Sequence, residues 1–231
     1  DSGYDYVGSG GVTALTNGNY VVLSPDWRNG SVTKAGAVTW GDGSIAGPRL
    51  TGQVTNLNSL VGSAVDDKVG LDGVTQLANG NYVVVSSEWG GSLGSKLGAV
   101  TWGSGTGAIT GTVSASNSLV GNVSDDRVGR DGIQVVGSNN YLVRSSYWNG
   151  SAGAVTWGSG SSGIFGVVSS TNSLVGRSPF DMTGGLYDVK VLSNGNYVIV
   201  SPFWDNGSAQ NVGAVTWGNG NSGVSGLISQ S

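Results

Sequence analysis

Four tryptophans stand where an aromatic ring could take part in binding a sugar. Each of them ends an apolar stretch and is followed by small polar residues. A flat ring can stack on the apolar face of a sugar while nearby amide groups bond to its hydroxyls. The pattern predicts weak binding of neutral glycans, with packing in the core or at its rim as the alternative role of the rings. The candidate residues are Trp27, Asn29, Trp89, Trp148, Asn149, Trp204 and Asn206.

A second recurring group is the aspartate of an Asp-X-Val-Gly segment or a relative of it. The four are Asp5, Asp67, Asp126 and Asp181. A carboxylate in such a turn can cap backbone N–H groups, or it can help to hold calcium. No Asp-X-Asp-X-Asp-Gly loop is present, so calcium is the weaker alternative, and no other cofactor is expected. Adjacent carboxylates such as Asp125 and Asp126 point to opposite sides of an extended chain, which argues against a glycosidase pair.

The composition narrows the possible functions. The 231 residues include no histidine and no cysteine, so the usual general base and the commonest metal ligands are missing and we do not expect an enzyme. Charged residues make up 10 % of the chain and the net charge is −4, which offers no basic surface for nucleic acid. No apolar run reaches the roughly 20 residues needed to cross a bilayer. The N-terminus has no signal-peptide pattern, so a mature protein or a fragment of one is expected.

The elements that must position these residues are repeats. The motif Gly-Ala-Val-Thr-Trp-Gly occurs at residues 36–41, 98–103, 153–158 and 213–218. It divides the chain into repeat 1 (1–64), repeat 2 (65–123), repeat 3 (124–178) and repeat 4 (179–231) of a single domain, 1–231. A unit of this size cannot bury a good core alone, so neighbouring repeats must share one.

Each repeat carries the same strand signals and none for a helix. A short apolar run, beginning near Val12 in repeat 1, leads into an Asn-Gly turn of the kind that closes a β-hairpin. A second strand starts at Tyr20, the repeated motif makes a third, and a more polar stretch at 52–59 predicts a fourth, outer strand.

These signals predict an all-β protein, specifically a β-propeller of four quasi-identical four-stranded blades. An open β-rich array and a double-sheet barrel are the alternatives. The tryptophan of the repeated motif is expected to pack between blades. The four are Trp40, Trp102, Trp157 and Trp217.

The motifs Asn-Gly-Asn-Tyr-Val-Val, Gly-Ala-Val-Thr-Trp-Gly and Asn-Ser-Leu-Val-Gly, in this order, resemble a repeat module of very large bacterial secreted or surface proteins of the adhesin type, including filamentous-haemagglutinin-like ones. The module is one of unknown function. The resemblance implies an extracellular or cell-surface setting, and a chain that is either part of a larger repeat protein or a monomer.

Two functions fit these observations. The first is a multivalent carbohydrate-binding, lectin-like or adhesive module, in which repetition supplies avidity. The second is a structural spacer or display domain that needs no ligand.

Overall fold

The computed structural model describes residues 4–44, 52–93, 95–185 and 189–229. Within these ranges the protein is almost entirely β-structure, as predicted. The one helical element, α1 (Trp148–Ser151), is a single turn, and Asn149 and Gly150 inside it have positive φ angles of 50° and 66°. It lies where the loop after the second strand is shortest.

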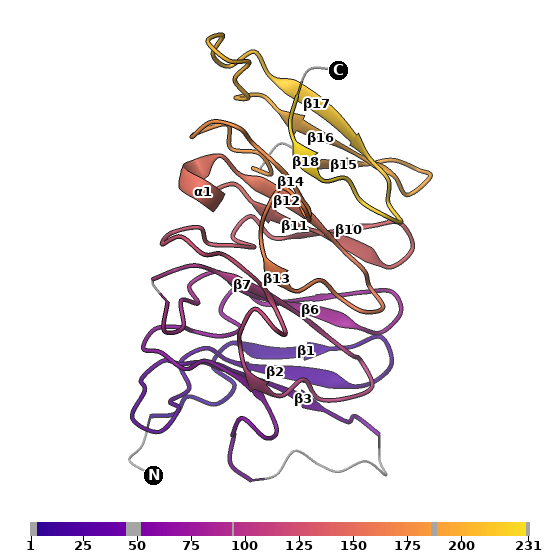
Figure 1. Cartoon of the computed structure of the whole chain (residues 1–231). Coiled ribbons are helices and arrows are strands. Elements are labelled where there is room, and N and C mark those ends of the chain that lie inside the picture. The colour runs from indigo at the N-terminus through magenta and orange to yellow at the C-terminus, as the bar shows by residue number, and fades with distance from the viewer. Residues whose placement is uncertain (1–3, 45–51, 94, 186–188, 230–231) are drawn as a thin grey trace.

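The strands form four sheets that follow one another from the N-terminal to the C-terminal end of an elongated stack (Figure 1). Repeat 1 supplies β1 (Gly11–Ala14), β2 (Tyr20–Ser24), β3 (Ala37–Gly41) and β4 (Leu60–Val61). Repeat 2 supplies β5 (Val74–Gln76), β6 (Tyr82–Ser86), β7 (Ala99–Gly103), β8 (Gly111–Thr112) and β9 (Leu119–Val120). Repeat 3 supplies β10 (Ile133–Val136), β11 (Asn140–Ser145), β12 (Ala154–Gly158), β13 (Gly166–Val167) and β14 (Ser173–Val175). Repeat 4 supplies β15 (Val189–Val191), β16 (Tyr197–Ser201), β17 (Ala214–Gly218) and β18 (Gly226–Leu227).

The prediction of a propeller with four-stranded blades does not match this arrangement. Three sheets have five strands, because the polar strand of each later repeat joins the sheet of the repeat before it. For example, β8 of repeat 2 pairs in parallel with β4 of repeat 1. Within a repeat, the strand that pairs with the Gly-Ala-Val-Thr-Trp-Gly strand is instead the short strand of the Asn-Ser-Leu-Val-Gly motif, called the Leu-Val strand below. In repeat 1 this strand is β4, which pairs with β3. Each of the first three repeats is therefore joined to the next one by a shared sheet.

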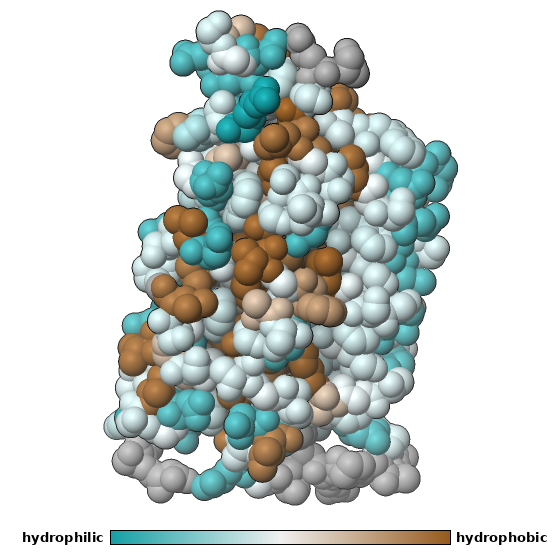
Figure 2. All heavy atoms as spheres, in the orientation of Figure 1, coloured by the Kyte–Doolittle hydropathy of each residue, from teal (hydrophilic) through white to brown (hydrophobic). Residues whose placement is uncertain are grey.

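The hydrophobic core, like the sheets, is shared only between neighbouring repeats. Among the described residues, every sheet and every core cluster joins neighbouring repeats or lies within one, and none joins repeat 1 to repeat 4. The two ends of the chain lie at opposite ends of the stack (Figure 1). Viewed from the same side, apolar side chains recur up the face of the stack, and the right margin in this view is more polar (Figure 2). The architecture is therefore an open array, which was one of the two alternatives from the sequence.

Within each sheet, a tyrosine ring packs over a glycine of the neighbouring strand. The first tyrosine of the second strand pairs with the last glycine of the repeated motif, as Tyr82 does with Gly103. A Cβ atom added at Gly103 would overlap the Tyr82 ring, so the ring lies flat over the glycine. Burial raises the pKa of the phenols of Tyr82, Tyr141 and Tyr197, that of Tyr197 to about 12.

Buried hydroxyl pairs hold the Leu-Val strand in register. The threonine of the repeated motif bonds to the serine of Asn-Ser-Leu-Val-Gly, with Oγ atoms 2.7 Å apart for Thr39 and Ser59. The pairs Thr101–Ser118 and Thr156–Ser173 repeat this contact at 2.7 and 2.6 Å. Each serine hydroxyl also donates to the side chain of the asparagine before it, so the pair gives the buried threonine hydroxyl its partner.

Candidate functional site

The feature that every repeat shares is its junction with the next one. At its centre lies the Leu-Val strand, which has a parallel neighbour on one side and an antiparallel neighbour on the other. Leu60 belongs to the same core cluster as Val69, Trp89 and Val113 of repeat 2. The N–H of Val113 donates to the carbonyl of Val61 at 3.1 Å, and Val168 and Ile228 make the same bond one and two junctions later.

The recurring aspartate fastens the end of this strand. In Asp67 one carboxylate oxygen accepts the N–H groups of Ser63 and Ala64, both at 2.8 Å. The other oxygen accepts the N–H groups of Gly90 and Gly91, which directly follow Trp89. Asp67 is buried, and it ties the link after one Leu-Val strand to the loop of the next repeat.

The same arrangement recurs at the next two junctions. Asp126 accepts N–H groups from Asn122, Val123 and Asn149, and Asp181 accepts them from Arg177, Ser178 and Asp205. The carboxylate oxygens thus face backbone donors. No group of three or more acidic side chains able to hold a metal ion lies within the described ranges. This is the geometry of a turn cap.

A second contact lies at the hairpin end of the junction. The indole N–H of Trp157 donates to the carbonyl of Gly220 in the next repeat at 3.1 Å, and the side-chain amide of Asn140 donates to the same oxygen at 2.9 Å. Trp40 and Trp102 make the equivalent bonds to Gly105 and Gly160. These tryptophans pack between repeats, as predicted, although the repeats are not propeller blades.

The asparagines of Asn-Gly-Asn have a role that the sequence analysis missed. Asn17 and Asn19 flank the hairpin turn, and their side-chain amides both donate to Gly105 at 2.7 and 2.8 Å. Asn79 and Asn81 do the same to Gly160. A two-residue turn requires only the first asparagine and the glycine. The second asparagine of the motif was therefore the one sequence signal that pointed to a contact with the next repeat.

The predicted sugar platforms have little exposed surface. The rings of Trp27, Trp89 and Trp204 are 6, 4 and 3 % exposed, and Trp148 is partly buried against the core. The indole N–H groups of Trp89, Trp148 and Trp204 are buried without a hydrogen-bond partner. Asn29 and Asn206 lie in the following loops, where each bonds through its backbone to Val32 and Ala209 respectively. The side-chain amide of Asn29 also donates to the carbonyl of Gly62 at 2.9 Å, and the backbone N–H of Asn149, in α1, donates to Asp126. Of the four candidate rings, three are therefore buried and that of Trp148 is half-buried.

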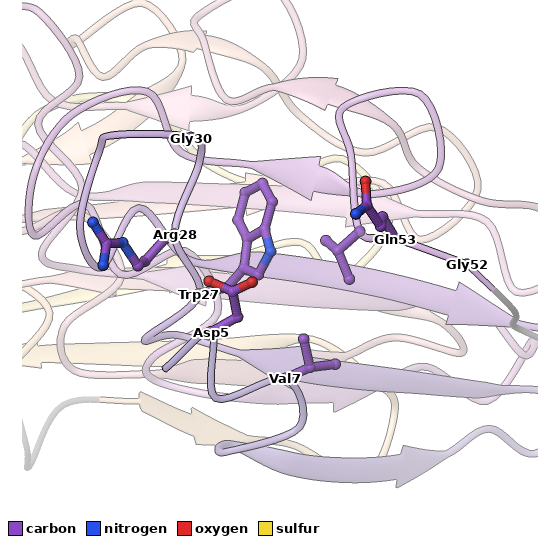
Figure 3. A pocket seen from close by; sticks show the side chains of 8 residues that line it. Asp5, Val7, Trp27, Arg28, Gly30, Gly52 and Gln53 are labelled. Carbon is purple, nitrogen blue, oxygen red and sulfur yellow. The ribbon is translucent and has the colours of Figure 1, made fainter. Parts of the chain in front are cut away.

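At the N-terminal end of the stack, a cavity of about 420 Å³ lies beside repeat 1 (Figure 3). Asp5 and Val7 line it together with Trp27, Gly52 and Val54. Among the described residues the Asp5 side chain has no hydrogen-bond partner. The cavity distinguishes repeat 1 from the other repeats, since Val7 is 59 % exposed whereas Val69, Val128 and Thr183 at the equivalent positions are buried.

Comparison with known families agrees with the repeat pattern. A family model described as a repeat of unknown function (DUF5650) matches the chain four times, at residues 14–71, 76–130, 135–185 and 191–231. These matches span most of the chain, so the protein belongs to this family. A search of curated proteins found no match. Within the described ranges, no helix is long and apolar enough to span a membrane.

The junction contacts predict a difference between two identical tryptophans. Trp157 contacts the next repeat, whereas Trp217, at the same motif position in repeat 4, is 54 % exposed. We expect Trp157→Ala to lower the free energy of unfolding by about 2 kcal/mol more than Trp217→Ala, because only the first loses buried area and a hydrogen bond. Chemical denaturation of both variants measures this. Equal losses would mean that the ring stabilises its own sheet alone.

The capping geometry predicts a difference between two adjacent aspartates. Asp126→Asn replaces one of the two carboxylate oxygens by an NH2 group, so at least one of the three backbone donors loses its acceptor, and it should cost about 2 kcal/mol or more. Asp125→Asn, at a side chain 63 % exposed in a surface ion pair with Arg127, should cost less than about 1 kcal/mol.

The melting temperature with calcium and with a chelator is the companion measurement. It should not change in the unmodified chain if these carboxylates serve only as caps. A rise with calcium that Asp126→Asn abolishes would identify a cation site instead.

Proposed function

We propose that this protein is a structural spacer, a stiff β-array that holds other parts of an assembly apart. The observation that carries the proposal is the shared strand: the sheet of each of the first three repeats includes a strand of the next repeat. A hinge between two such repeats would require breaking a parallel strand pair, so bending is costly. A spacer needs this property and needs no ligand.

The contacts at the junction support the same function. Each one combines a buried Leu-Val strand, an aspartate cap and a tryptophan with asparagines that donate to one glycine carbonyl. All three elements recur at successive junctions with nearly the same distances. Nearest-neighbour contacts of this kind let an array grow by adding units.

Carbohydrate binding is less well supported as a function. Its predicted platforms are rings that are buried at the junction, and burial leaves no face for a sugar to stack on. A setting in a large secreted or surface protein of bacteria, of the adhesin type, is part of the spacer proposal. It rests on the sequence resemblance.

Small-angle X-ray scattering tests the spacer. The full chain should scatter as an elongated particle. A shorter chain of residues 1–185 should keep the same cross-section, lose about a quarter of its length and still unfold cooperatively, because only one junction is removed. Scattering from a compact or freely bending particle would contradict the spacer.

Titration with neutral glycans tests the alternative function on the same chain. Saturable binding of a neutral glycan, lost in Trp204→Ala at unchanged stability, would favour the carbohydrate function instead.

A further inference from the structure

The cavity at the N-terminal end of the stack coincides with a position that is filled in every later repeat. In repeats 2, 3 and 4 the polar strand pairs in parallel with the Leu-Val strand of the preceding repeat. Their Asp-X-Val-Gly segment also bonds to the preceding repeat, just before its repeated-motif strand, as the N–H of Val69 does to the carbonyl of Ala35. In repeat 1 the corresponding segments are Asp5–Gly8 and Gly52–Val54, and both line the cavity. The three internal junctions therefore show what such a cavity accommodates.

Exposure of equivalent side chains shows that the cavity is an open junction. Val7 is 59 % exposed, whereas its counterparts Val69, Val128 and Thr183 are fully buried. Val54 is partly exposed, whereas Val113 and Val168 are 2 % exposed. The side chains at these positions are buried in the repeats whose polar strand pairs with a preceding Leu-Val strand, and they are more exposed in repeat 1.

We propose that this cavity binds an extended peptide with the sequence character Leu-Val-Gly followed by a small residue, such as the corresponding strand of another repeat. The inference rests on the proposed function, since in an array that grows by adding units each unit must accept the strand of a neighbour. Binding would occur by addition of a parallel strand to Gly52–Val54, a known mode of peptide recognition.

The internal junctions define the hydrogen bonds that the peptide would make. The backbone N–H of Gly111 donates to Ser59 and that of Val113 donates to Val61, so Gly52 and Val54 would donate to the same positions of the peptide. Asp67 accepts the two N–H groups that follow Gly62. Asp5 would accept the two equivalent groups of the peptide. The leucine and valine side chains would cover Val7 and Val54, the two exposed or half-buried valines that line the cavity.

The probe is a synthetic peptide with the sequence of residues 56–64, Asn-Leu-Asn-Ser-Leu-Val-Gly-Ser-Ala. Fluorescence anisotropy of the labelled peptide, titrated with the full chain, should show saturable binding at one site per chain. The same peptide carrying Leu60→Asp should not bind. Asp5→Ala in the chain should weaken binding about tenfold, because two hydrogen bonds to a charged acceptor are lost.

Two surface variants of the chain locate the site. Val7→Asp should weaken binding more than tenfold, because it places a charge where the equivalent residues are buried. Val12→Asp is the matched control, since Val12 is similarly exposed, at 64 %, and does not line the cavity. It should leave binding unchanged. Both side chains are exposed in the free chain, so neither variant should impair folding.

Several outcomes would overturn the proposal. No binding at millimolar peptide, or binding that Val7→Asp leaves intact, would show that the cavity is not an acceptor for this strand. Sedimentation of the chain alone is run alongside, and self-association that Val7→Asp reverses would assign the cavity to another copy of the protein. An elongated chain that binds no peptide would leave the spacer intact, whereas a compact or flexible chain would contradict the spacer whether or not it bound the peptide.

Discussion

The structure depends on one constraint, which is that the Leu-Val strand of a repeat is buried only when the next repeat adds a strand to its side. Leu60 and Val61 are fully buried between β3 of their own repeat and β8 of the following one. The three other strands of its own repeat cover only one side of the Leu-Val strand, so a repeat alone could not bury it. The sharing of this strand makes the array continuous, and it gives the array a direction.

The remaining contacts follow from that arrangement. Once the strand passes between two repeats, the link after it must turn next to the loop that follows Trp89, and Asp67 supplies acceptors for the N–H groups of both segments. Gly36 has a positive φ of 77°, and it lies so close to the Asp-X-Val segment of repeat 2 that a side chain would overlap the backbone of Val69. The hairpin end is closed by the tryptophan and asparagine donors. The aspartate, the glycine and the tryptophan are thus parts of one junction.

Much of the fold could be predicted from sequence, because it depends on local patterns. The hairpins, the strand of the repeated motif and the absence of long helices follow from turn residues and apolar runs. The partner of the polar strand could not be predicted, since Gly111–Thr112 has the same pattern whether it pairs within its repeat or with β4. The Leu-Val strand was missed because two residues carry no period. Trp27 is as buried as Trp89 and Trp204, and it packs against Ala37 and Val61 of its own repeat. The burial of these rings thus comes from packing against other strands, which their position at the end of a strand did not reveal.

Amide hydrogen exchange followed by NMR tests the shared strand most directly. The N–H groups of Val113, Val168 and Ile228 donate to the preceding repeat, whereas no bond of this kind from the N–H of Val54 is found among the described residues. The account predicts strong protection at the first three and exchange at least tenfold faster at Val54. Equal protection at all four positions, or fast exchange at all four, would contradict the claim that each repeat is completed by its neighbour.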